Sequence, residues 1–242
     1  MNAPSPVGQA KGRSDVTRGI VDWAVKALVA RLSVAAILFV SAGRLDWVMG
    51  WVFAGLYAAF DIATALVVIP RSPELLIERT RVHEGTKGWD RVLLRIAAGY
   101  LPMASWIVSG LDVRFGWSPQ ISPRLQIAGL AITALGFAVV VWAMASNAFF
   151  SVTVRIQEER GHTVATGGPY RYVRHPGYVG AILFQVATPI LLGSLWALIP
   201  AGLSAPAYVV RTALEDRTLR EELDGYQEYA QRVRYRLLPG IW

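Results

Sequence analysis

Residues 167–178 read Gly-Gly-Pro-Tyr-Arg-Tyr-Val-Arg-His-Pro-Gly-Tyr, and they stand immediately before the longest apolar run of the chain, 178–210. At ~1.5 Å per residue, one helix over that run would measure about 50 Å, whereas the hydrocarbon core of a bilayer is about 30 Å thick. The run therefore predicts a helical hairpin that reverses near Gly193 and Ser194. Because residues 167–178 are rich in Tyr and Arg, we expect them at the membrane surface.

Four other windows approach the ~20 apolar residues that a membrane crossing needs. They are 27–43, 47–69, 92–110 and 125–145. The composition agrees with a membrane protein, since 54% of the 242 residues are hydrophobic and nine are Trp. Together with the hairpin, the windows predict an all-α polytopic membrane protein with about six transmembrane helices.

The distribution of Lys and Arg predicts how the chain is oriented in the membrane. With both termini in the cytoplasm, the inside segments hold eighteen of these residues, and the outside loops hold Arg44, Arg114 and Arg124. This imbalance favours an even number of crossings. A basic face beside anionic lipid also accounts for the net charge of +7, so we expect a bilayer and no nucleic acid as partner.

Two further expectations come from composition alone. The first ~20 residues are polar and contain Pro, Gly and Ser, which predicts a disordered start, with 15–28 as an amphipathic surface helix. The chain has no Cys, which excludes disulfides, thiolate catalysis and thiolate metal sites. No metal site is expected.

The residues around Pro176 predict a helix start that suits ligand binding. Proline lacks the N–H that is unpaired in a first helical turn, and His175 before it is kept out of the helical region. The first N–H groups of this helix, with Arg171 and Arg174 nearby, would suit an anionic group. Three tyrosines offer flat faces for an adenine or a sulfonium: Tyr170, Tyr172 and Tyr178. The alternative is that these residues are interfacial anchors.

A helix predicted over about 207–235 carries carboxylates on the face that should be buried. At 100° per residue, this face holds Arg211, Glu215, Leu219, Glu222, Tyr226, Tyr229 and Val233. Buried carboxylates need a partner, which a cationic ligand or an Arg could supply. The alternative is an internal pair between Arg211 and Glu215, four residues apart.

Three smaller features lie outside these regions. Alternation in 152–156, a turn at 158–161 and a return over 162–165 predict a small β-hairpin. Asp61 lies at membrane depth and is expected to pair with Arg95 unless it is functional. Residues 73–79 predict a short amphipathic helix on the inner surface, either an anchor or a lid over an acceptor.

Residues 167–178 resemble the GPYRYxRHPxYxG signature of the integral-membrane methyltransferases that include isoprenylcysteine carboxyl methyltransferase and the phospholipid N-methyltransferases. The last helix also agrees with the family, which has an acidic pair, a Leu, two Tyr and an Ile-Pro there. The corresponding residues of this chain are Glu215-Asp216, Leu219, Tyr226, Tyr229 and Leu238-Pro239. Asp216 replaces the family's second Glu, and Leu223-Asp224-Gly225 replaces a Phe-Gly step. The resemblance covers about 125–242, taken as the catalytic unit, and leaves 1–124 unassigned.

The resemblance implies S-adenosylmethionine as the methyl donor, held on the cytoplasmic side. The residues that it implies for this cofactor are Tyr170, Arg171, Arg174, His175, Pro176, Tyr178 and Glu215. Methyl transfer needs alignment and exclusion of water more than a nucleophilic side chain. Arg174 is the candidate cation for a carboxylate acceptor, and Glu222 is the candidate base for an amine acceptor. A lipophilic acceptor would come from the membrane.

Two other classes of protein remain open at this stage. Membrane sterol and enone reductases also carry an Arg-His-Pro-x-Tyr-x-Gly-like element and use NADPH, for which Arg232, Arg234 and Arg236 could bind the 2′-phosphate. The Gly-Pro-Tyr-Arg-Tyr start and the Glu215-Asp216 pair favour the methyltransferase. A non-enzymatic transporter or scaffold would place polar residues near mid-membrane in paired broken helices. The polar clusters here lie at the cytoplasmic boundary instead.

Overall fold

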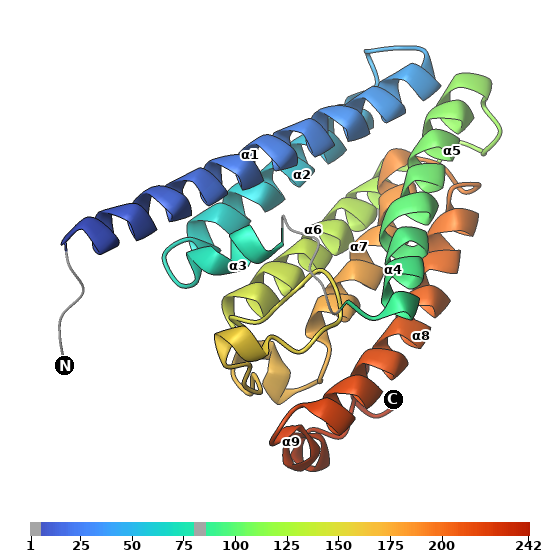
Figure 1. The fold of residues 1–242 in the computed structure, drawn as a ribbon. Helices are drawn as coiled ribbons and strands as arrows, with labels where there is room; N and C mark the ends of the chain where they lie inside the picture. Colours follow the sequence, from blue (N-terminus) through green and yellow to red (C-terminus); the bar gives the residue numbers. More distant parts are fainter. Residues whose placement is uncertain (1–5, 80–85) are drawn as a thin grey trace.

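The computed structural model describes residues 6–79 and 86–242, with side chains from residue 15 onward (Figure 1). Within these ranges the chain forms helices and no strand, which confirms the all-α prediction there. The α-helices are α1 Pro6–Ala42, α2 Val48–Val68, α3 Pro73–Glu78, α4 Gly88–Leu94, α5 Leu101–Phe115, α6 Pro123–Ala145, α7 Pro176–Leu192, α8 Leu198–Glu222 and α9 Tyr226–Arg232.

Four helical stretches of the described chain are long and apolar enough to cross a membrane, and they coincide with the four predicted windows. They are Asp15–Ala42, Val48–Val68, Gly88–Phe115 and Pro123–Ala145. The third combines α4 and α5 through a π-helical turn, Arg95–Tyr100, which precedes Pro102. Proline donates no hydrogen bond to the preceding turn, and the wider turn accommodates it. Six crossings remain a prediction, because α7 has 17 residues and α8 is charged over its second half.

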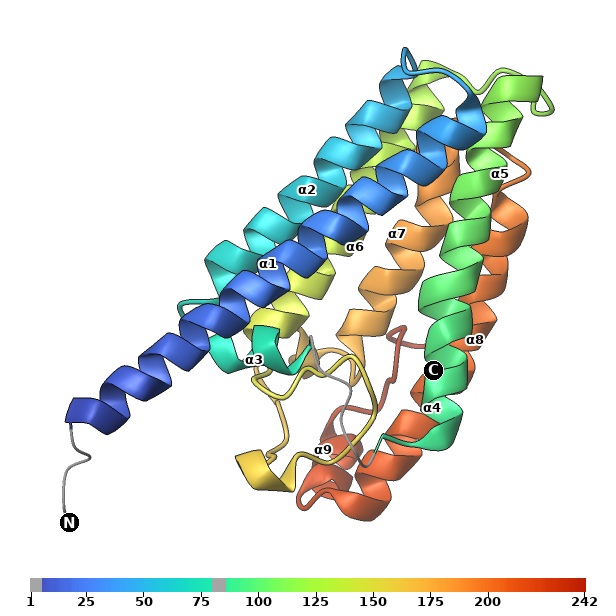
Figure 2. The ribbon, with the colours of Figure 1, turned by 45° about the horizontal axis from the view of Figure 1, so that its top comes forward.

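The short elements gather at one end of the helix bundle (Figure 2). Helix α3, the segment 146–175 and α9 lie at this end, whereas the connections 43–47, 116–122 and 193–197 lie at the other. The predicted short helix over 73–79 is confirmed as α3. Helix α7 begins at Pro176, as the signature predicts. The signature therefore lies at the same end of the bundle as α3, which comes from the opposite half of the sequence.

The start of the chain differs from the prediction of disorder. Helix α1 already runs from Pro6, so 6–20 are helical and 15–28 are part of one long helix, while 1–5 lie outside the described residues. Proline suits the first position of a helix. Packing against α3 supports this part of α1, since a Cβ on Gly19 would lie 2.5 Å from the Ile77 side chain.

The predicted single helix over 207–235 is two helices. Helix α8 ends at Glu222, and α9 begins at Tyr226 after Gly225, whose φ is 78°. Only glycine adopts this left-handed conformation readily, so the turn is encoded by the Leu223-Asp224-Gly225 step. The prediction of one continuous helix was therefore wrong at 223–225, although Tyr226 and Tyr229 of α9 are buried, as the projection had them.

The segment 152–165 contains no β-hairpin. Its backbone groups bond to partners elsewhere: the Val154 N–H donates to Asp90 at 2.8 Å, and the Val152 carbonyl accepts from Arg211 at 2.6 Å. A 3₁₀ turn, Glu158–Arg160, stands where a turn was predicted. The alternating pattern was misleading because these distant side chains replace the partner strand.

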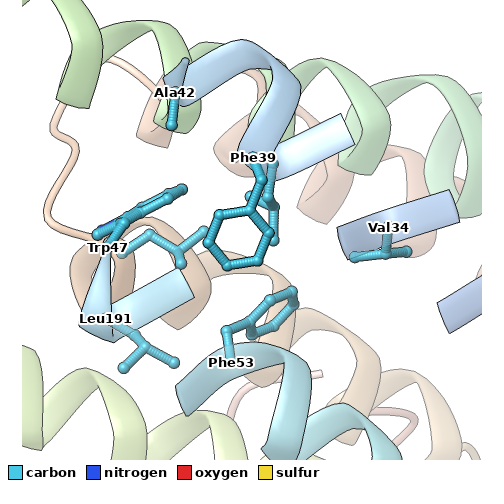
Figure 3. Close-up of a cluster of buried hydrophobic side chains, with 8 residues drawn as sticks. Val34, Phe39, Ala42, Trp47, Phe53 and Leu191 are labelled. Atoms are coloured by element: carbon cyan, nitrogen blue, oxygen red, sulfur yellow. The ribbon is translucent and has the colours of Figure 1, made fainter. Parts of the chain in front are cut away.

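An apolar cluster fixes α1 and α2 against α7 (Figure 3). The six labelled residues are Val34, Phe39, Ala42, Trp47, Phe53 and Leu191. Phe39 meets Trp47 edge-on with ring centroids 6.2 Å apart, a favourable aromatic geometry. The cluster holds the N-terminal half of the chain against the C-terminal half.

Helices α6 and α7 approach each other closely where each carries a glycine. A Cβ on Gly136 would lie 2.7 Å from the Gly180 carbonyl oxygen and from the Phe184 nitrogen, and a Cβ on Gly180 would lie 2.5 Å from the Gly136 carbonyl oxygen. These neighbours are backbone atoms, which cannot move aside as a side chain can. Small residues allow this kind of packing in membrane proteins.

We expect Gly136→Ala to lower the free energy of unfolding by about 1–3 kcal/mol, because the added methyl group forces the two helices apart. Unfolding in detergent, followed by circular dichroism, measures the change. Gly55→Ala is the matched control, since a Cβ there meets nothing within 4 Å. Equal stability of the two variants would contradict the close contact.

Candidate active site

A cavity of about 330 Å³ lies among α2, α6, α7, α8 and the segment 147–165. Its volume is in the range of small-molecule sites. One part is polar and is lined by Tyr170, Arg174, His175, Tyr178 and Glu215. The other is aromatic and is lined by Tyr57, Phe60, Phe137 and Phe184. The structure thus brings five of the predicted site residues to one cavity.

The buried carboxylate of Asp216 joins the signature to the end of the chain. It accepts from Arg174 Nε at 2.6 Å, from Arg236 Nε at 2.9 Å and from the Tyr226 hydroxyl at 3.0 Å. Burial opposes its ionisation, but hydrogen bonds from His175 and Arg174 outweigh this, and the pKa of Asp216 lies well below its usual range. Asp216 therefore stays ionised at neutral pH.

Arg174 is held on every side by the protein itself. Its Nη1 donates to the carbonyls of Val233 and Arg234, both at 2.7 Å, and its other donors reach Asp216. The backbone N–H groups of Arg174 and His175 donate to the Tyr235 and Arg236 carbonyls, at 2.9 and 3.0 Å. These groups position the start of α7, and in this arrangement they are already satisfied.

Glu215 lies one residue before Asp216 and faces the cavity. It accepts a hydrogen bond from the Tyr178 hydroxyl. The suggested internal pair with Arg211 does not form, because Arg211 donates to Asp90 at 2.6 Å and to the Val152 carbonyl at 2.6 Å. Glu215 is consequently available to a cationic ligand.

Three tyrosines beside this carboxylate form a fixed aromatic wall. Tyr226 and Tyr229 meet edge-on at 5.5 Å, and the Tyr229 hydroxyl donates to the Tyr170 carbonyl at 2.7 Å. Asn147 donates to the Tyr170 hydroxyl at 3.2 Å. Burial raises the pKa of each of these three tyrosines, so they remain neutral. Their rings are suited to hold a flat or cationic group.

Three predicted site residues do not line the cavity. Arg171 is exposed, and Pro176 is buried as the first residue of α7. Glu222, the predicted base, lies at the surface, where its carboxylate accepts from Lys87 at 2.6 Å. Glu222 belongs to the last turn of α8, and its pair with Lys87 holds it at the surface although the helical projection placed it on the buried face.

Several residues of the site carry no signal in the signature. Asp61 pairs with Arg31 at 2.6 Å and not with Arg95, and the Arg31 guanidinium lies 3.7 Å from the centre of the Tyr57 ring. Arg155 reaches Glu78 of α3 at 2.6 Å. Arg31 could have been predicted as the partner of Asp61. Helices α1 and α2 are consecutive and run in opposite directions, so Arg31 and Asp61 lie at the same depth in the membrane.

The charges around the cavity are paired with two exceptions. Among the described residues that line it, Arg31, Arg155, Arg174 and Arg211 each form an ion pair. Glu215 and Arg79 have no oppositely charged group within ion-pair distance in the described part of the chain. The cavity therefore offers one carboxylate and one guanidinium to a ligand.

The apolar helices, the signature and the acidic pair are features that the chain shares with a class of membrane methyltransferases. Residues 128–221 match the model of the isoprenylcysteine carboxyl methyltransferase (ICMT) family, which confirms the resemblance drawn from the motifs. The match includes Tyr170, Arg174, His175, Tyr178 and Glu215, and it excludes Arg79.

Individual relatives agree with this family. The protein-S-isoprenylcysteine O-methyltransferase of Homo sapiens is 26% identical over 194 residues, 76% of this chain and 62% of its own length. That of Schizosaccharomyces pombe is 30% identical over 114 residues, 42% of this chain and 46% of its own. A probable one of Oryza sativa subsp. indica is 34% identical over 86 residues, 35% of this chain and 45% of its own. The chain thus spans about half the length of the last two, and more of the human relative.

We expect Asp216→Asn to destabilise the protein by about 3–5 kcal/mol, because it leaves buried guanidinium groups without their counter-charge. Thermal unfolding in detergent measures the effect. Glu221→Gln is the control on the same helix, since its pair with Arg217 is exposed, and we expect little change. Similar stability of the two variants would mean that Asp216 does not hold the site together.

His162 makes the segment 157–165 sensitive to acid. Burial lowers its pKa to about 4, with Arg160 and Arg155 adding to the effect, and its Nδ1 accepts from the Gln157 N–H at 3.3 Å. The unfolded segment binds a proton near pH 6.5, so stability is lost as pH falls from there toward 4. Hydrogen exchange should show faster opening of this segment at pH 5 than at pH 7. In His162→Gln this pH dependence should be absent, and its persistence would exclude His162 as the cause.

Proposed function

We propose that the chain is an integral-membrane methyltransferase that uses S-adenosylmethionine to methylate a lipophilic acceptor. One observation carries the proposal: residues of the signature and Glu215 of the acidic pair line one cavity, where Glu215 has no cationic partner among the described residues. The family match supports the same reaction. The relatives named above are protein-S-isoprenylcysteine O-methyltransferases, which favours an acceptor of similar chemistry.

The residues of the polar part fit the chemical groups of this donor. Glu215 would accept hydrogen bonds from its hydroxyl or ammonium groups and balance its positive charge, and Tyr178 fixes the carboxylate. Tyr170, Tyr226 and Tyr229 would hold the flat base and the sulfonium. When bound, the donor supplies a methyl group that is already activated by the positive sulfur. The protein's contribution is then orientation and exclusion of water.

The remaining predicted residues have different places in this proposal. Arg174 and His175 position the start of α7 and border the donor, while Pro176 starts the helix. Arg171 is exposed beside the signature and would meet only the edge of a ligand or the lipid surface. Glu222 has no part in it, because its carboxylate is paired with Lys87 outside the cavity.

The proposed orientation places the cavity's polar part at the cytoplasmic surface. Six crossings, with α7 and the apolar part of α8 as a hairpin, would leave both termini in the cytoplasm. The Lys and Arg distribution supports this. Residues 125–242 would form the donor-binding unit, and 1–124 would contribute the acceptor side, since Tyr57 and Phe60 line the aromatic part.

We expect saturable binding of S-adenosylhomocysteine, the donor without its methyl group, to the detergent-purified protein by calorimetry. Glu215→Gln should weaken it by about tenfold or more, equivalent to about 1.4 kcal/mol or more, because a neutral amide no longer balances the ammonium group, the one positive group of this ligand. Glu221→Gln, on the exposed side of α8, should bind as the wild type does.

NADPH is titrated in parallel to separate the enzyme classes. Binding of NADPH without S-adenosylhomocysteine would replace the proposal with a membrane reductase. Binding of neither by folded protein would favour a non-enzymatic membrane protein.

A further inference from the structure

A second cavity, of about 300 Å³, adjoins the first on the side of α1 and α2. Its lining includes Trp23 of α1, Phe60 and Thr64 of α2, and Met144 of α6. Arg31, Phe60, Arg79 and Val152 line both cavities, so the two meet at these residues. A ligand at this junction would touch the N-terminal half of the chain and the aromatic part of the candidate active site.

The cations at the junction differ in their partners. Arg31 pairs with Asp61 at 2.6 Å, and Lys26 pairs with Asp22 at 2.8 Å. Arg79, which ends α3, has within the described chain only the Phe150 carbonyl at 3.4 Å and the Phe150 ring at 5.3 Å. Its charge is therefore not balanced by a carboxylate of the described protein.

An unbalanced guanidinium in a half-buried position is costly unless a ligand compensates it. Burial, and then the nearby Arg211, lower the pKa of Arg79 to about 10, which leaves it positively charged at neutral pH. A positive group here repels an ammonium and attracts a carboxylate or phosphate, with which guanidinium forms paired hydrogen bonds. The other unpaired charge, Glu215, has the opposite sign and suits the cationic donor.

We propose that Arg79 is the residue that binds and orients the carboxylate of the methyl acceptor. The apolar part of the acceptor lies in the second cavity, against Trp23, Phe60 and Met144. The inference rests on the proposed function and adds to it a specificity residue outside the family match.

The reaction balances without a base. A carboxylate oxygen forms the bond to the methyl carbon, the sulfur–methyl bond breaks, and its electron pair stays on the sulfur. An ionised carboxylate has no proton to lose, whereas an ammonium acceptor must first give one up. This agrees with Glu222 being outside the cavity.

The test is calorimetric binding of N-acetyl-S-farnesylcysteine, an amphiphile with one carboxylate, to protein saturated with S-adenosylhomocysteine. We expect Arg79→Gln to weaken binding by about tenfold or more and Arg79→Lys to restore part of it, because lysine keeps the charge but not the fork geometry. The exposed Arg71→Gln is the matched control and should bind normally. The carboxamide analogue should bind wild type weakly and be insensitive to Arg79→Gln.

In methyl transfer to the same acceptor, Arg79→Gln should raise KM by about tenfold or more with a smaller change in kcat, since the lost contact is made before and during the reaction. Equal affinity of wild type and Arg79→Gln for the acid would overturn the proposal. A second result would also overturn it: Arg79→Gln loses binding of dodecyl phosphate but still binds N-acetyl-S-farnesylcysteine. Arg79 would then belong to a site for lipid phosphate.

Binding of S-adenosylhomocysteine to each variant separates the two proposals. Arg79→Gln should retain it, which also shows that the variant is folded. If wild type binds no S-adenosylhomocysteine but still binds the acid through Arg79, the methyltransferase proposal fails and the carboxylate site stands. If wild type binds S-adenosylhomocysteine but not N-acetyl-S-farnesylcysteine, the methyltransferase proposal stands and the carboxylate site fails.

Discussion

The ion pair between Arg174 and Asp216 is the interaction on which the rest of the site depends. Asp216 is buried, and its charge is balanced by guanidinium groups from three places in the sequence: the signature, α8 itself and the C-terminal segment. A carboxylate at such depth is tolerated only with this degree of compensation. The C-terminal residues consequently belong to the site's framework although few of them reach the cavity. The two acidic residues have different roles: Asp216 pairs with arginines of the protein, whereas Glu215 faces the cavity and can bind a ligand.

Short sequence patterns predicted the features that depend on residues close together in the chain. Pro176 sets the start of α7, apolar windows set four long helices, and Tyr170, Tyr178 and Glu215 meet as the motifs implied. Contacts between distant elements were not predictable in this way. The partner of Asp61 depends on how α1 and α2 lie together, and the fate of 152–165 depends on Asp90 and Arg211. Glu222 was misplaced because its ion pair with Lys87, 135 residues away in the chain, holds it at the surface.

The two parts of the cavity are built by different means. The polar part is held by buried ion pairs and by main-chain bonds that tie 174–175 to 235–236, so its geometry has few alternatives. The aromatic part consists of ring stacking, such as that of Tyr57 on Phe137 at 4.9 Å, which rotamer changes can rearrange. Arg79, which lines both cavities, caps α3, a helix of six residues whose position depends on its neighbours. One cavity thus combines a polar part of fixed geometry with an aromatic part whose side chains can rearrange.

The glycine contact between α6 and α7 has a consequence for how such a protein can diversify. Since main chain touches main chain there, we expect α6 and α7 to keep their spacing, whereas α1 and α2, which line the second cavity, leave more room for variation. These two helices lie entirely outside the segment that matches the family. Under the proposed function, acceptor preference can therefore change, in nature or by design, through substitutions on one wall, while the opposite wall and the donor site stay the same.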